Sequence, residues 1–157
     1  MRASIICIVC SFLLVVSSLA QIPSDRDGLL SAEGMGQAKY AEMNGYPGPK
    51  HVLDLADKLQ LSDVQKKSVQ AIYNEMSTRA KEIGKQIVRI EEEMSDAFAR
   101  NFAVEKSVRD DSEEIGRLRG KLRSVHLIAH LKTKPLLTAK QVEIYNTLRG
   151  MGKEEKH

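Results

Sequence analysis

Apolar residues recur at alternating steps of three and four between residues 63 and 100, and this spacing predicts one long amphipathic helix. No proline interrupts the segment, so we expect a helix of about 38 residues, roughly 57 Å long at 1.5 Å per residue. The apolar set is narrow, as in the contact seam of a coiled coil. Its members are Val69, Ile72, Met76, Ala80, Ile83, Ile87, Ile90, Met94 and Phe98.

A second long helix is predicted after a break at residues 101–106. Ser107 is followed three residues later by Asp110, a spacing typical of a helix N-cap. Pro135 ends the helix, because the residue before a proline is disfavoured in helical geometry. Two long helices joined by a short loop pack antiparallel, so the sequence predicts a helical hairpin. The apolar stripe of the second helix is Val108, Ile115, Leu118, Leu122, Val125 and Ala129.

Two shorter helices complete a predicted all-α domain over residues 50–150. The first follows Pro49, which suits the first turn of a helix, and ends near Gln60. The last follows Thr138 and stops at Gly150.

Residues 21–49 have a different pattern. Glycine and proline recur through them, and the run Tyr46-Pro47-Gly48-Pro49 favours a turn or an extended piece. We expect a flexible N-terminal arm at residues 21–49 and a polar tail at residues 151–157.

The first twenty residues have the pattern of a secretory signal peptide. Arg2 precedes an apolar run, and the small residues Ser18 and Ala20 form a cleavage site before Gln21. An alternative is an uncleaved membrane anchor, because residues 3–20 could just span a thin bilayer. We expect export with cleavage after Ala20.

Composition narrows the classes of function. Both cysteines, Cys7 and Cys10, lie in the predicted signal peptide, so the mature chain has no disulfide, no thiol nucleophile and no cysteine-based zinc site. The formal net charge of +3 comes from 24 basic and 21 acidic residues, and this near balance gives no argument for a nucleic-acid partner. No nucleophile elbow, phosphate-binding loop or metalloprotease signature occurs, so we expect that the protein is not an enzyme.

The predicted seams are too narrow to bury the apolar surface of an isolated hairpin, so we expect a homodimer or an exposed face that binds a partner. Basic side chains on both long helices either steer acidic or unfolded partners or form an ordinary solvated face. Gly84, Gly116 and Gly120 each cost about 1 kcal/mol relative to alanine inside a helix. They either permit a close backbone approach or lie at the surface.

Two helix starts share the pattern Leu-Ser/Thr-x-x-Gln. In each, the hydroxyl accepts a hydrogen bond from the backbone N–H of the glutamine, whose side chain reaches back to the hydroxyl residue, which makes a capping box. Loss of one such cap should cost about 1 kcal/mol. The residues are Leu61, Ser62 and Gln65 in the first motif and Leu137, Thr138 and Gln141 in the second.

Two such motifs at opposite ends of a long helical hairpin, behind a signal peptide, resemble the LTxxQ family of periplasmic proteins that includes the chaperones Spy and CpxP. The resemblance covers about residues 50–150. The second motif matches the pattern fully, and the first has serine in place of threonine. The run Ala129-His130-Leu131 is also similar to the corresponding region of Spy.

This resemblance implies a four-helix protomer that pairs antiparallel into a cradle-shaped homodimer. It also implies an ATP-independent periplasmic chaperone, with unfolded or partly folded envelope proteins as clients. A periplasmic sensor-kinase domain is a further partner of the CpxP-like members. The motif residues are then structural helix caps rather than catalytic groups.

Histidines supply an alternative function. His126 and His130 lie four residues apart on a predicted helix, so both rings project from one side and could hold one ion. His51 or a glutamate of a partner chain would be the third ligand. The related ZraP and CnrX proteins are metal-responsive, so the resemblance implies as an alternative a periplasmic sensor or regulator that binds zinc, nickel or copper. The other interpretation is a packed imidazole, because His126 borders the apolar stripe.

Overall fold

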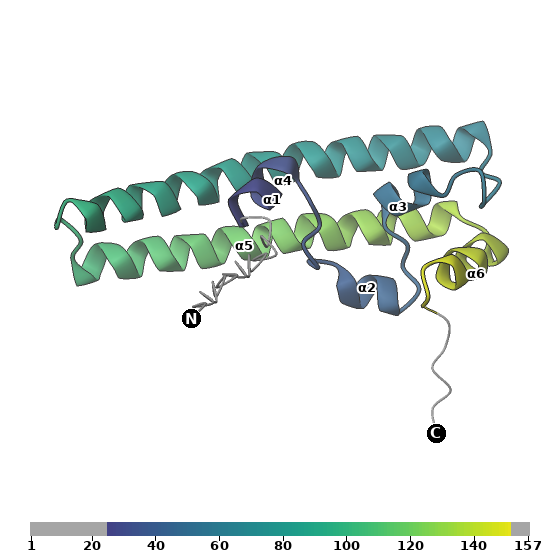
Figure 1. Cartoon of the computed structure of the whole chain (residues 1–157). Coiled ribbons are helices and arrows are strands. Elements are labelled where there is room, and N and C mark those ends of the chain that lie inside the picture. The colour runs from purple at the N-terminus through teal and green to yellow at the C-terminus, as the bar shows by residue number, and fades with distance from the viewer. Residues whose placement is uncertain (1–24, 152–157) are drawn as a thin grey trace, which may run out of the picture.

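The computed structural model describes residues 25–151, and every regular element in this part of the chain is helical (Figure 1). The predicted all-α class is therefore confirmed. The predicted signal peptide at residues 1–20 and the tail at residues 152–157 lie outside the described residues. The elements are α1 (Asp25–Ser31), α2 (Lys39–Met43), α3 (Pro49–Asp54), α4 (Asp63–Ala99), α5 (Glu105–Thr133), the 3-10 helix η1 (Lys134–Leu136) and α6 (Ala139–Leu148).

The two long helices, α4 and α5, form the predicted antiparallel hairpin and run side by side along their length (Figure 1). Helix α4 ends at Ala99, within one residue of the expected position. Their turn, at the left of Figure 1, is called the tip here, and the opposite end, where α3 and α6 pack, is called the base.

Helix α5 begins three residues earlier than predicted, at Glu105 rather than after a Ser107 cap. Val104 has extended backbone and serves as the N-cap position. The Ser107 hydroxyl instead lies in the first turn, where it donates to the Val104 carbonyl at 3.0 Å and accepts from the Val104 N–H at 3.4 Å. A serine in the first turn can therefore bond the cap residue. The sequence alone does not distinguish such a serine from one at the N-cap position itself.

The four helices expected over residues 50–150 are present as α3 to α6, and the segment before Pro49, expected to be a flexible arm, adds α1 and α2. Helix α1 packs on α4, and its Leu29 is 2% exposed. Arg26 forms an ion pair with Glu92 of α4 at 3.0 Å, and Asp25 pairs with Arg119 of α5. The flexibility of the N-terminal arm stays a prediction, but its Leu29 packs against α4 and α5.

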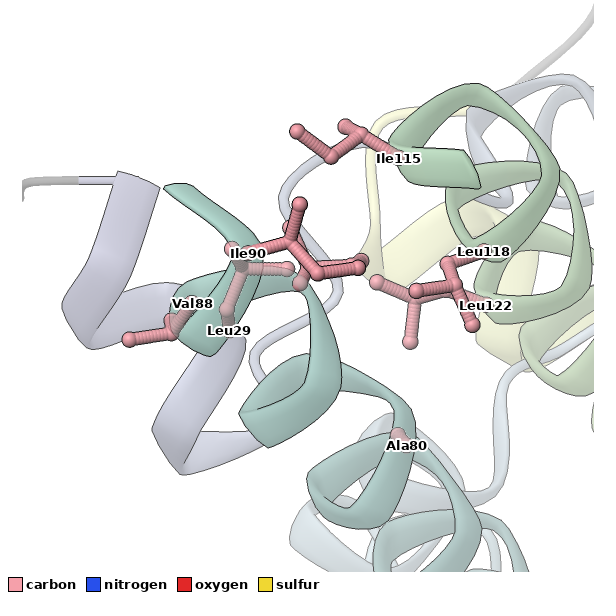
Figure 2. Close-up of a cluster of buried hydrophobic side chains, with 8 residues drawn as sticks. Leu29, Ala80, Val88, Ile90, Ile115, Leu118 and Leu122 are labelled. Carbon is pink, nitrogen blue, oxygen red and sulfur yellow. The ribbon is translucent and has the colours of Figure 1, made fainter. Parts of the chain in front are cut away.

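Two apolar clusters hold the helices together. The first lies midway along the hairpin, where Leu29 meets side chains of α4 and α5, and Figure 2 shows Leu118 and Leu122 of α5 facing those of α4. The second lies at the base, where Val52, Leu59, Leu61 and Val69 surround the fully buried Tyr145 of α6.

The three helix glycines divide between the two interpretations. A Cβ added at Gly84 would lie 2.1 Å from the Leu29 carbonyl oxygen, so this glycine permits the backbone of α1 to approach α4 closely. Gly116 and Gly120 would place a Cβ in open space. Only Gly84 is required by packing.

No helix between residues 25 and 151 combines the length and the apolar character that a membrane crossing requires.

Candidate functional site

The two Leu-Ser/Thr-x-x-Gln motifs lie together at the base of the hairpin. The Ser62 hydroxyl accepts from the Gln65 N–H at 3.2 Å, and the Ser62 N–H donates to Gln65 Oε1 at 3.0 Å. Thr138 and Gln141 repeat these contacts at 3.2 and 2.9 Å. Both predicted capping boxes are therefore present in the structure.

The two glutamines also bind one another, a contact that the sequence analysis did not anticipate. Gln65 Nε2 donates to Gln141 Oε1 at 2.9 Å, and Gln141 Nε2 donates to Gln65 Oε1 at 3.2 Å. The second donor of each amide reaches a carbonyl across the base, Leu136 at 2.8 Å for Gln65 and Leu59 at 3.2 Å for Gln141. We call this reciprocal pair the amide clasp.

The amide clasp explains why both motifs end in glutamine. A glutamate would accept the cap N–H equally well, but a carboxylate has no N–H to donate. The clasp ties the start of α4 to the start of α6, two positions 76 residues apart in the chain. The four polar motif residues thus cap helix starts, whereas Leu61 and Leu137 pack in the apolar cluster at the base.

A shallow apolar groove, with a volume of only about 20 Å³, lies between α4 and α5 near the base. Ile72 and Met76 of α4 and Val125 and Ile128 of α5 contribute its floor and walls. Arg79, at its edge, precedes the α1-contacting Gly84 by five residues, about 140° around a helix. The groove therefore opens on a different side of the hairpin from α1.

Charged side chains border this groove. Lys132 of α5 donates to Glu75 of α4 at 2.9 Å, and Arg79 also reaches Glu75, at 3.4 Å. The hydrogen bond from Lys132, followed by its charge, lowers the pKa of the Glu75 carboxyl below its usual range. Glu75 is therefore ionised near neutral pH, and the hairpin presents apolar and charged atoms on one surface.

The tip carries a second apolar surface. Phe98, Phe102 and Val104 are 57%, 74% and 59% exposed. Phe98 was expected in the seam, but the opposite stretch of α5 between Val108 and Ile115 is polar and offers it no apolar partner. The signal that could have found this surface is that gap in the α5 stripe.

His126 and His130 are both buried but have different contacts. His126 and His130 are 4% and 6% exposed. His130 Nδ1 lies 2.7 Å from the Tyr46 carbonyl oxygen, so its ring anchors the turn before α3. Burial, and secondarily the charge of His130, lowers the pKa of His126 below its ordinary value. Both rings are therefore buried in the fold.

His51 belongs to a different group of polar side chains at the base. Its Nε2 lies 3.6 Å from Glu42 Oε1, and the same carboxylate oxygen accepts from the Tyr145 hydroxyl at 3.1 Å. Arg149 reaches the other oxygen of Glu42 at 3.5 Å. Glu42 thereby links α2 to α3 and α6, and burial raises the pKa of the Tyr145 hydroxyl above its ordinary value, which keeps it a neutral donor.

The described residues do not fit a complete metal site. Between residues 25 and 151 no group of three or more His, Cys, Asp or Glu side chains could hold an ion. His51 lies with Glu42 and Asp54 rather than as a third ligand beside His126 and His130. His126 Nε2 is buried without a hydrogen-bond partner, which marks it as a cost to the fold.

The comparisons with known proteins add no relative. No protein-family model, no curated protein and no solved structure matches this chain.

Proposed function

We propose that this protein is an ATP-independent, non-enzymatic chaperone of the periplasm, which acts as a homodimer and holds unfolded or partly folded envelope proteins. The proposal rests first on the surface of the hairpin, where exposed apolar side chains alternate with charges. Such a surface attracts unfolded chains through charge and apolar contact. The resemblance of the two capping motifs and of the signal peptide to the Spy/CpxP family points the same way.

The observation that carries the proposal is the groove of Ile72, Met76, Val125 and Ile128 with its charged border. Helices α4 and α5, which form it, pack against each other along the hairpin, and the amide clasp ties the start of α4 to α6. A client can therefore bind without remodelling the hairpin, which lowers the entropic cost of association. A rigid groove of this kind needs no nucleotide to open it.

The test is suppression of client aggregation by the purified mature protein, which begins at Gln21. Heat-denatured malate dehydrogenase, followed by light scattering, is a suitable client. We expect suppression near a stoichiometric ratio, and weaker suppression by the double variant Ile72→Ser/Ile128→Ser. Met43→Ser/Leu148→Ser removes two other exposed apolar side chains and is the matched control. Absence of suppression by the parent protein would refute the proposal.

The same titration tests the alternative metal-responsive function. The parent protein and a His126→Ala/His130→Ala variant are compared with and without added zinc. Equal suppression of client aggregation with and without zinc, in both proteins, supports a chaperone function that needs no metal. Suppression that requires zinc and is lost in the variant would favour the sensor function instead.

A further inference from the structure

The turn at the tip of the hairpin has a defined backbone conformation. Asn101 adopts the left-handed region with φ of 59°. The N–H groups of Phe102 and Ala103 both donate to the Ala97 carbonyl, at 2.8 and 3.2 Å. This turn closes the end of α4 with backbone hydrogen bonds, so the backbone that carries Phe102 is ordered.

Both phenylalanines of the described chain, Phe98 and Phe102, lie at this tip, together with Val104. Phenylalanine normally contributes to a core, because burying its ring stabilises by about 1.5–3 kcal/mol. Here the core uses aliphatic side chains and Tyr145, while the two phenyl rings face solvent. None of the other described helices lies beside the tip (Figure 1).

The charge around the tip is opposite in sign to the charge of the remaining chain. Residues 96–113, which form the tip, include five acidic and three basic residues, whereas the rest of the sequence has 16 acidic and 21 basic residues. The three basic residues of the tip are each paired within it, to Asp96, Asp110 and Glu105. Asp111 and Glu113 of α5 form no ion pair with the described residues, so the tip keeps a negative surplus within about three turns of Val104.

We infer that the tip is a docking surface for extended polypeptide segments in which apolar side chains alternate with lysine or arginine. The phenyl rings and Val104 supply apolar contact, and the surplus carboxylates attract the cationic side chains. The positive body of the same chain repels such a segment, so charge confines it to the tip. This inference deepens the proposed function, on which it rests, because it gives the chemistry of one class of client segment and a surface separate from the groove.

Fluorescence anisotropy with three labelled peptides tests the inference on the mature protein. The first peptide contains Leu and Phe with Lys and Arg; the second replaces the cations with Glu; the third replaces the apolar residues with Ser. We expect the first to bind most tightly. Phe98→Ser/Phe102→Ser should weaken its binding by about tenfold or more, while Met43→Ser/Leu148→Ser leaves it unchanged.

Charge has its own variant. Asp111→Asn/Glu113→Gln should weaken binding of the cationic peptide by about two- to fivefold at low salt, and the difference should vanish near 0.5 M salt because of screening. All substituted side chains except Asp111 are exposed, and Asp111 is half-buried, so thermal unfolding of each variant checks that the fold is intact.

Several outcomes would overturn the inference. Equal binding of the acidic peptide, or unchanged binding by the phenylalanine variant, would remove the tip as the site. Binding to phosphatidylcholine vesicles without peptide binding would assign the tip to lipid. Loss of self-association in sedimentation by the phenylalanine variant, without loss of peptide binding, would assign it to a second copy of this chain.

The outcomes also separate this inference from the proposed function. Aggregation suppression that survives Phe98→Ser/Phe102→Ser, without tip-dependent peptide binding, keeps the chaperone and rejects the tip. Tip-dependent peptide binding by a protein that fails to suppress aggregation keeps the docking surface and rejects the chaperone.

Discussion

Gln65 and Gln141 each make two kinds of contact that a single side chain seldom combines. Each side-chain oxygen completes its own capping box, and each amide nitrogen reaches the other motif. Glutamate preserves the first contact and loses the second, since a carboxylate donates no N–H. Gln65→Glu therefore removes a hydrogen bond of the clasp and leaves the capping box intact.

We expect Gln65→Glu to lower the free energy of unfolding by about 1–3 kcal/mol, because the Leu136 carbonyl and Gln141 Oε1 lose a donor. A protein in which the motif is only a cap would tolerate this substitution. Urea unfolding measures the change. The double variant with Gln141→Glu should lose more stability than the two single variants together, since it removes both amide bonds and places two carboxylates against each other.

His126 gives a residue-scale prediction for pH. Burial lowers its pKa, as burial followed by the charge of Arg149 lowers that of His51. As the pH falls through the ordinary value of about 6.5, the unfolded chain takes up these protons first. The free energy of unfolding is therefore highest above that pH and decreases below it.

The measurement is the urea midpoint of the parent protein and of His126→Leu across that range of pH. We expect the parent midpoint to fall on acidification and the variant to lose part of the slope, because leucine removes a buried ring nitrogen that has no partner. An identical slope in both proteins would show that His126 does not titrate with unfolding.

Among elements, α1 depends on one position of α4. Alanine normally stabilises a helix interior by about 1 kcal/mol relative to glycine, but at Gly84 its Cβ would meet the backbone of Leu29. Gly84→Ala should therefore destabilise the protein and release α1, whereas Gly116→Ala should stabilise it by roughly 0.5–1 kcal/mol. Hydrogen exchange at Leu29 and urea unfolding distinguish these results. Equal effects of the two substitutions would contradict this packing.

The elements that sequence periodicity predicts well are those whose signals are local. The Ser62 cap, the absence of proline and the regular apolar steps fix the limits of α4 to within one residue. The docking of α1 depends on a contact between Leu29 and Gly84 across 55 positions of the chain, and no local pattern carries that information. A glycine inside a strong helix pattern is the only trace of it.

The same distinction applies to the candidate site. Both capping boxes are local and follow from sequence, whereas the amide clasp requires that two distant helix starts meet at the base. Phe98 continues the seam by spacing alone, and its exposure follows only when α5 is placed opposite and is found to be polar there. Periodicity therefore identifies apolar positions, but pairing of the elements decides which of them are buried.

At the scale of the whole molecule, charge is divided along the hairpin. The tip has a negative surplus, while residues 115–134 of α5 and η1 contain six basic residues and no acidic one. Arg117 and Arg119 form ion pairs with Glu114 and Glu91 where these regions meet. Their far ends, at the turn near Val104 and at Lys132, lie roughly 40 Å apart along α5 at 1.5 Å per residue, well beyond a Debye length of roughly 8–10 Å. Each can therefore attract partners of opposite charge independently of the other.

This separation predicts that the basic part of α5 steers acidic unfolded clients. Lys121 and Arg123 are exposed there, and Lys121→Glu/Arg123→Glu should slow association with an acidic client several-fold at low salt, with little change near 0.5 M salt. Lys39→Glu/Lys58→Glu makes the same change in net charge away from α5 and should have a smaller effect. Stopped-flow binding measures the rates. If both pairs slow association equally, net charge alone governs the capture of clients. If only the α5 pair slows it, the division of charge along the hairpin decides where acidic clients bind. In that case Lys121→Glu/Arg123→Glu should not weaken binding of the cationic peptide at the tip.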